Sequence, residues 1–221
     1  MNNGWPVKPM GEVCENLDSK RIPITKNKRV AGKYPYYGAS GVVDHVNDYI
    51  FDEDLLLVSE DGANLLARTY PIAFSVVGKV WVNNHAHVLR FPDRASQRFI
   101  EFYLNSISLD PYVSGMAQPK LNQKSLNSIS IPVPPLPEQR RIVGILDEAF
   151  DGIATAKANA EQNFQNARAL FESHLNAVFT QRGHGWEQKP LSELCDIKHG
   201  FAFKSPFFTD QQQFPANKKV A

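Results

Sequence analysis

The sequence predicts an α+β protein in which a mixed or antiparallel β-rich domain is followed by one long coiled-coil-forming α-helix. Three observations lead to this prediction. Short apolar segments separated by Gly, Asn and Asp run from about residue 34 to residue 91, as they do in a β-sheet. Apolar and small residues then recur roughly every 3.5 residues between Ile142 and Ala177, which is the spacing of a coiled coil. Finally, the opening of the chain is repeated at residues 185–195.

Bulk composition places the chain among ordinary globular proteins. Of its 221 residues, 43% are hydrophobic and 21% are charged, and the formal net charge is only +1. No apolar run approaches the ~18 residues that a membrane-spanning helix needs, and the polar Met-Asn-Asn-Gly start is unlike a signal peptide. We therefore expect a cytoplasmic protein. The near-neutral charge does not by itself indicate a nucleic-acid partner.

Strands are expected wherever a short apolar segment is bounded by turn-forming residues. They cover residues 41–46, 55–59, 73–77, 79–82 and 86–91. Before them, residues 10–17 can form a short helix behind Pro9, and the basic stretch that follows is expected to be a loop. After them, apolar spacing predicts a helix over residues 96–107 and a last strand over residues 128–133.

A long helix follows a proline-rich segment. Four prolines within residues 132–137 enforce an extended chain, and Pro137 is well placed to open a helix. A helix over residues 137–181 would be ~65 Å long. It would gain most of its stability from packing, so it needs a partner helix. The alternative is a helix packed on its own domain, which its length disfavours. The seam expected to contact the partner is Ile142, Leu146, Ala149, Ile153, Ala156, Ala160, Ala167, Leu170 and His174.

The repeat indicates two copies of one domain. Residues 4–14 and 185–195 are identical at six of eleven positions, and their separation far exceeds the ~20–50 residues of solenoid repeats. We therefore expect a first domain at 1–136, the helix at 137–182, and the start of a second, incomplete domain at 183–221. Cys14 and Cys195 hold equivalent places, which favours a small buried residue used twice over a disulfide.

No catalytic constellation emerges from the sequence. It holds no Gly-rich phosphate loop and no nucleophile motif, and Glu60 and Asp61 are typical of a strand end entering a turn rather than of a nuclease site. His85 and His87 alternate as they would on one face of a strand, but the further ligands of a zinc site are missing. A polar loop, or contacts to phosphates or base edges, are the alternatives. We predict no catalytic residue and no metal.

Two groups of cations and amides are the candidate nucleic-acid contacts. Residues 20–33 hold six basic residues and no acid, and tyrosines follow them directly. The second group combines lysines with Asn122 and Gln123, whose amides can recognise base edges. Lys and Arg are the residues that bind phosphate, although a solvated charged face is the alternative. The candidate DNA-binding residues are Lys20, Arg21, Lys26, Lys28, Arg29, Lys33, Tyr36, Tyr37, Lys120, Asn122 and Lys124.

Several motifs together resemble those of the specificity (S) subunit of type I restriction–modification systems. The most specific is PPLPEQR at residues 134–140. The others are YPYYGASG at 34–41, SEDGAN at 59–64, GKVWVNNHAHVL at 78–89, QPKLN at 118–122 and GFAFKS at 200–205. The resemblance runs from Trp5 to about Phe208. Such subunits carry two target recognition domains, each followed by a long helix. The chain therefore resembles the N-terminal half, with the second recognition domain truncated.

The resemblance implies a non-catalytic protein that reads one half of an interrupted DNA target and docks methylation (M) and restriction (R) subunits. S-adenosylmethionine, ATP and Mg²⁺ would belong to those partners, and the chain itself would hold no cofactor. Two alternatives stay open: a fragment of a single-chain methyltransferase or nuclease that has lost its catalytic module, and an assembly factor that does not bind DNA.

A homodimer is expected on the same grounds. The apolar seam has no second helix within this chain, and two copies can each supply the other's missing helix across a two-fold axis. The interface would cover residues 138–181. Because a symmetric protein favours a symmetric site, the DNA target would be an interrupted palindrome.

Overall fold

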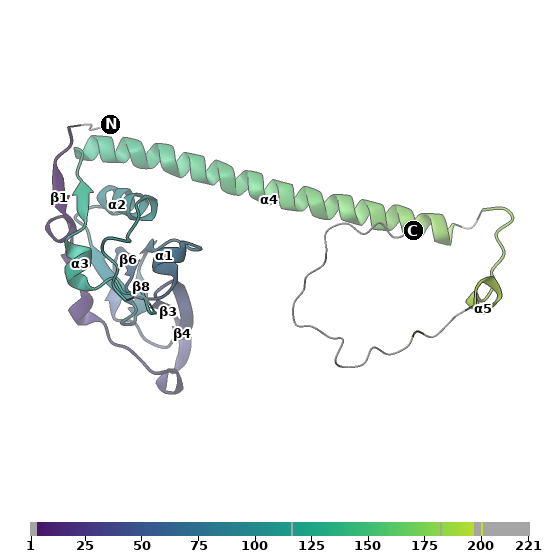
Figure 1. The fold of residues 1–221 in the computed structure, drawn as a ribbon, viewed down its shortest axis with the longest axis horizontal. Coiled ribbons are helices and arrows are strands. Elements are labelled where there is room, and N and C mark those ends of the chain that lie inside the picture. The colour runs from purple at the N-terminus through teal and green to yellow at the C-terminus, as the bar shows by residue number, and fades with distance from the viewer. Residues whose placement is uncertain (1–3, 116, 182, 197–199, 201–221) are drawn as a thin grey trace. The chain divides into compact units, whose positions relative to one another are not determined.

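The computed structural model describes residues 4–115, 117–181, 183–196 and 200 (Figure 1). The chain divides into two compact units, Met1–Asn159 and Ala160–Ala221, and the boundary falls inside one continuous helix. The predicted α+β class is confirmed, because the first unit is rich in β-strands and the helix is present. Most of the predicted third region, 183–221, lies outside the described residues, and so does most of the GFAFKS motif.

An antiparallel sheet with the strand order β2-β9-β6-β7 forms the centre of the first unit. Its strands are β2 (Glu15–Asn16), β6 (Leu55–Ser59), β7 (Ala73–Val76) and β9 (Ala86–Arg90). All of β6 is buried, because Leu56 and Val58 face one apolar core while Leu55 and Leu57 face a second. Burial on both faces explains why this strand is continuously apolar.

A second sheet, with the order β4-β3-β8-β5, covers the second core. Its strands are β3 (Ala31–Gly38), β4 (Gly41–Val46), β5 (Phe51–Asp52) and β8 (Lys79–Val82). β3 pairs antiparallel with β4 and parallel with β8, so the sheet is mixed. The basic stretch predicted to be a loop therefore ends in a strand, because β3 begins at Ala31 and includes Lys33.

Helix α2 (Arg94–Ser106) packs on the first sheet and buries Phe99, Ile100 and Leu104 in the first core. The Asp93 side chain caps this helix by accepting from two backbone N–H groups, as a good N-cap residue does. Two short helices complete the unit, α1 (Asn64–Ala67) and α3 (Gln123–Asn127). The predicted helix at 96–107 is thus confirmed with slightly earlier bounds.

Strand β1 (Val7–Pro9) pairs antiparallel with β10 (Ser130–Pro132), which joins the two sequence ends of the β-rich region. The helix predicted over residues 10–17 is wrong. Only Met10–Glu12 forms a 3-10 turn, η1, and the chain then enters β2. Two further 3-10 turns, η2 (Asp18–Lys20) and η3 (Lys26–Lys28), lie on the basic segment.

Helix α4 (Leu136–Thr180) is 45 residues long. The buried Gln139 side chain donates to the carbonyl of Pro134 at 2.8 Å, and Ile142 and Val143 pack against the first core. Beyond residue 147 every residue of the helix is exposed except Ala177. In the described part of the chain, no helix combines the length and apolarity that a bilayer crossing requires.

The repeated segment adopts the same local turn in both places. Pro9 and Pro190 are both extended, with ψ of 146°, and each precedes a short helical turn, η1 or α5 (Leu191–Leu194). In both turns the cysteine thiol donates to the carbonyl four residues earlier, at 3.4 Å for Cys14 and 3.5 Å for Cys195. Cys195 is nevertheless exposed, so the expectation that both thiols are buried is wrong for the second copy.

Candidate nucleic-acid interface

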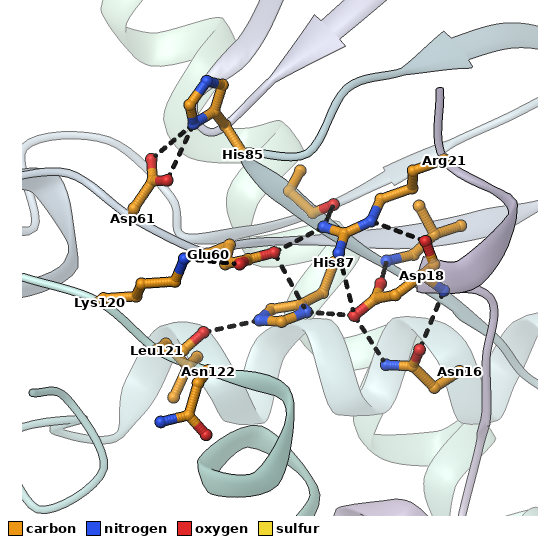
Figure 2. Close-up of polar contacts among 12 residues, drawn as sticks. Asn16, Asp18, Arg21, Glu60, Asp61, His85, His87, Lys120, Leu121 and Asn122 are labelled. Carbon is orange, nitrogen blue, oxygen red and sulfur yellow. Dashed lines mark hydrogen bonds and ion pairs between the residues drawn. The ribbon is translucent and has the colours of Figure 1, made fainter. Parts of the chain in front are cut away.

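Three loops that carry the sequence motifs meet around Glu60, the residue directly after β6 (Figure 2). Its backbone N–H donates to the carbonyl of His85 at 2.9 Å, and its carbonyl accepts from the N–H of Leu121 at 2.8 Å. Its carboxylate contacts Arg21 at 2.6 Å and the ammonium of Lys120 at 3.2 Å. Segments far apart in the sequence are thus joined at one buried carboxylate.

A second carboxylate, Asp18, lies beside the same cluster and contacts His87 (Figure 2). The fully buried His87 ring has its Nδ1 2.6 Å from Asp18 Oδ2 and its Nε2 2.7 Å from the carbonyl of Leu121. Both ring nitrogens of His87 are therefore engaged with oxygen atoms of the protein. Asp18 also accepts from the N–H of Val88 at 2.9 Å.

The charges of this cluster keep both carboxylates ionised. Burial by itself raises the pKa of Asp18, but the hydrogen bond and charge of His87 outweigh it and hold that pKa below its ordinary value. Burial likewise raises the pKa of Glu60, and the hydrogen bond from Arg21 together with the charge of His87 lowers it below the usual range. The cluster therefore places two carboxylates among the side chains of Arg21, His87 and Lys120.

Spacing alone would let Asp18, Glu60 and His87 hold a metal ion, because their ligand atoms lie within 4.8 Å of one another. The contacts argue for a different role. Both nitrogens of His87 already contact oxygen atoms of the protein, so a metal ion would have to displace one of these contacts. Arg21 and Lys120 supply the positive charge that the carboxylates need. We interpret the group as an ion cluster that ties loops together.

The basic segment at residues 20–33 is held by contacts to both sheets. Arg21 donates to Glu60 and to the carbonyl of Ala86, while Arg29 donates to Asp44 at 3.0 Å and lies 4.4 Å from the centre of the Tyr36 ring. The buried Tyr36 hydroxyl accepts from the N–H of Ile24. These contacts fix the path of the segment over β3.

Three predicted DNA-binding residues, Arg21, Arg29 and Tyr36, therefore have their side chains committed to internal contacts. Lys120 is paired with Glu60, and Tyr37 is half-buried beside Phe74. The Asn122 side chain caps α3. The remaining lysines are exposed, and the described residues form no ion pair with them: Lys20, Lys26, Lys28, Lys33 and Lys124.

Sequence reasoning missed one pair of the site. His85 Nδ1 lies 2.8 Å from the carboxylate of Asp61, and the imidazole is half-exposed (Figure 2). The alternation of His85 and His87 suggested a shared face, but His85 stands in the turn before β9 and the two rings contact different carboxylates.

The turn between β3 and β4 is held by a hydrogen bond from the Ser59 hydroxyl to the carbonyl of Ala39.

Comparison with known proteins gives a consistent result. The model of the family described as the type I restriction modification DNA specificity domain matches residues 2–162. A putative type I restriction enzyme specificity subunit of Haemophilus influenzae is 39% identical over 63% of this chain and 36% of its own length. The type I restriction enzyme MjaVIII specificity subunit of Methanocaldococcus jannaschii is 23% identical over 93% of this chain and 52% of its own length.

Solved structures share the fold. The type I restriction–modification S subunit from M. genitalium gives a TM-score of 0.56 at 18% identity, over 97% of this chain and 60% of that one. The HsdS subunit from Thermoanaerobacter tengcongensis gives 0.53 at 21% identity, over 80% and 45%. The chain thus spans between about a third and three fifths of the length of these relatives.

Proposed function

The chain belongs to the family of the type I restriction modification DNA specificity domain, and on that premise we propose that it is the DNA-recognition component of such a system. In this proposal the first unit reads one half of an interrupted target. The chain has no catalytic role of its own and docks methylation and restriction subunits, which carry S-adenosylmethionine, ATP and Mg²⁺. It acts in the cytoplasm, where the host DNA lies.

The observation that carries the proposal is a row of exposed lysines on a segment whose path is fixed. Lys20, Lys26, Lys28 and Lys33 are exposed on the basic segment that Arg21 and Arg29 anchor. Because the segment is anchored, only the lysine side chains, and not its backbone, lose freedom when they bind a phosphate backbone.

Residues able to contact base edges lie beside this segment. Asn84 and His85 are exposed in the turn before β9, and Arg21 ties that turn to the basic segment by donating to the carbonyl of Ala86. Ser40 is exposed at the tip of the β3–β4 hairpin, which Ser59 secures. Amide, imidazole and hydroxyl groups offer the donors and acceptors that base recognition in a groove requires.

Helix α4 supports association of two chains. Ile153 is 63% exposed and Leu170 is 72% exposed on the predicted seam, and Phe164 and Phe171 are exposed near it. Such an apolar stripe favours a partner helix. We propose a homodimer through residues 138–181. Ile142, which was predicted to lie in the seam, packs against the core of its own domain instead. The two identical halves would then read an interrupted palindrome.

The proposal is tested by selection from a pool of random-sequence DNA duplexes with the purified 221-residue chain. We expect recovery of one short motif, repeated in inverted orientation across a fixed gap. Recovery of random sequences would contradict sequence-specific recognition. If the chain also failed to shift any duplex at low salt, an assembly factor without DNA binding would be the better description.

The enzymatic alternative is tested separately. The purified chain is incubated with radiolabelled S-adenosylmethionine and the selected duplex, and we expect no label in the DNA. Methyl transfer by the chain alone would favour the fragment of a single-chain methyltransferase.

A further inference from the structure

Glu60 is the point through which three loops are held together. Its backbone bonds to the turn at His85 and to the segment at Leu121, and its carboxylate bonds to Arg21 of the basic segment and to Lys120. Its own side chain is only 12% exposed. A carboxylate in this position does not contact a DNA phosphate, since like charges repel, so any effect it has on DNA is exerted through its neighbours.

Arg21 and Lys120 lie closer to the Glu60 carboxylate than His87 does, and they differ in what they could bind if that carboxylate lost its charge. The Arg21 side chain is 13% exposed and also bonds to backbone carbonyls, whereas that of Lys120 is 52% exposed. Lys120 has no other ion-pair partner among the described residues. Without the charge of Glu60, its ammonium becomes free to bind phosphate.

We propose that Glu60 sets how well the chain discriminates its target from other DNA, by fixing the three loops and by keeping Lys120 from binding phosphate. This inference rests on the proposed function. Glu60 is a positioning residue in this role, because it acts through Lys120, Arg21 and the loop backbones.

Two opposite effects follow from loss of the charge at Glu60. Contacts to phosphate increase affinity for every sequence equally and steepen its dependence on salt. Base contacts depend on the positions of the loops, so loosening the loops weakens binding to the target alone. Removal of the carboxylate therefore increases non-specific affinity while it decreases specific affinity. A residue that only stabilised the fold would decrease both.

The experiment compares Glu60→Gln with wild type on two duplexes, the one selected by the wild-type chain and a scrambled version of it. We expect the scrambled duplex to bind severalfold more tightly, with a salt slope steeper by about 0.9, the change that one additional bound phosphate produces. We expect the ratio of target to scrambled affinity to fall on the order of tenfold, as for about one misread base pair. Glu148→Gln, which removes an exposed charge on α4, is the matched control and should change neither quantity.

A second variant, which leaves Glu60 in place, keeps the test decisive if Glu60→Gln folds poorly. Lys120→Ala should leave the salt slope of the wild-type chain unchanged, because the ammonium is already occupied. The double variant Glu60→Gln with Lys120→Ala should lose the added slope. A shallower slope for Lys120→Ala alone would overturn the inference, since it would show that Lys120 binds phosphate in the wild type.

The outcomes separate the two proposals. If the wild-type chain shows no preference for any duplex, the proposed function fails and this inference fails with it. If the wild type prefers its target and Glu60→Gln keeps both the ratio and the slope, only the role of Glu60 is wrong.

Discussion

Arg98 on α2 donates two hydrogen bonds, of 3.0 and 2.8 Å, to a single carboxylate oxygen of Asp147 on α4. The same guanidinium lies 4.3 Å from the centre of the Phe102 ring, which stacks on Phe150 with centroids 5.6 Å apart. Together with the packing of Ile142, these contacts fasten the first turns of α4 to the β-rich domain.

Removal of the two partners of this pair should have unequal effects. Asp147→Asn should lower the free energy of unfolding by less than about 1 kcal/mol, because both side chains are roughly a third exposed or more. Arg98→Ala should lower it by about 1–3 kcal/mol, because Arg98 is also the cation beside the buried Glu101. Urea unfolding measures both values, and equal losses would contradict this account of Glu101.

Stability should depend on pH through Asp18 and Glu60. Their pKa values are lowered in the folded chain, so the unfolded chain binds protons more readily. The two ionised carboxylates therefore stabilise the fold fully only above their ordinary pKa values of 3.8 and 4.5. This stabilisation is then lost as pH falls through those values toward the folded ones. Melting temperatures measured from pH 7 to pH 3 should therefore fall steeply below about pH 4.5.

A variant identifies the source of this acid sensitivity. Asp18→Asn should melt at a lower temperature at pH 7, because His87 loses its charged partner, and its melting temperature should change less between pH 5 and pH 3 (roughly the range in which carboxylates titrate). Asp151→Asn, at an exposed position on α4, should behave like wild type. If the melting temperature of Asp18→Asn falls as steeply between pH 5 and pH 3 as that of the wild type (roughly the range in which carboxylates titrate), other carboxylates cause the acid sensitivity.

Replacement of Lys26 and Lys28 by Ala should weaken binding to all duplexes by a similar factor. These lysines are exposed on η3, and each phosphate that the variant no longer neutralises should reduce the salt slope by about 0.9. Gel shifts at several salt concentrations measure the slope. The control pair, Lys8→Ala with Lys157→Ala, removes the same charge from exposed positions outside the basic segment. If both pairs give the same slope, η3 does not contact DNA.

Charge placed in the seam of α4 should dissociate the proposed homodimer. Ile153→Glu with Leu170→Glu changes two highly exposed seam positions, so the fold of the first unit should be unaffected. Sedimentation at micromolar concentration should show a dimer for wild type and a monomer for this variant. Gln162→Glu with Gln165→Glu adds the same charge away from the seam, on exposed positions, and should stay dimeric. A monomeric wild type would refute the homodimer.

Periodicity in the sequence was sufficient to predict the bounds of the long and regular elements. The strands at 55–59 and 79–82 have the predicted bounds, and α4 begins and ends within one residue of the predicted helix at 137–181. The two-residue strands β2 and β5 were missed, because a segment of that length is too short to show a period.

The candidate site was harder to predict because its partners are distant in the sequence. The absence of acids from residues 20–33 made all six cations there candidates for contact with DNA. The carboxylates that pair with Arg21 and Arg29 come from Glu60 and Asp44, which lie elsewhere in the sequence. Only the tertiary fold brings those charges together, so a count of local charges overestimates the surface that can bind phosphate.

The pairing of β1 with β10 has a consequence for biosynthesis. Residues 7–9 can find their partners only after residues 130–132 have been synthesised, and such non-local pairing slows folding. The ribosome must therefore release nearly the entire β-rich domain before this two-stranded sheet can form. Until then, the face of β6 and β9 that packs in the first core lacks the cover of Ile131 and is open to aggregation or to chaperones. Helix α4, whose backbone bonds are all local, can form as it emerges.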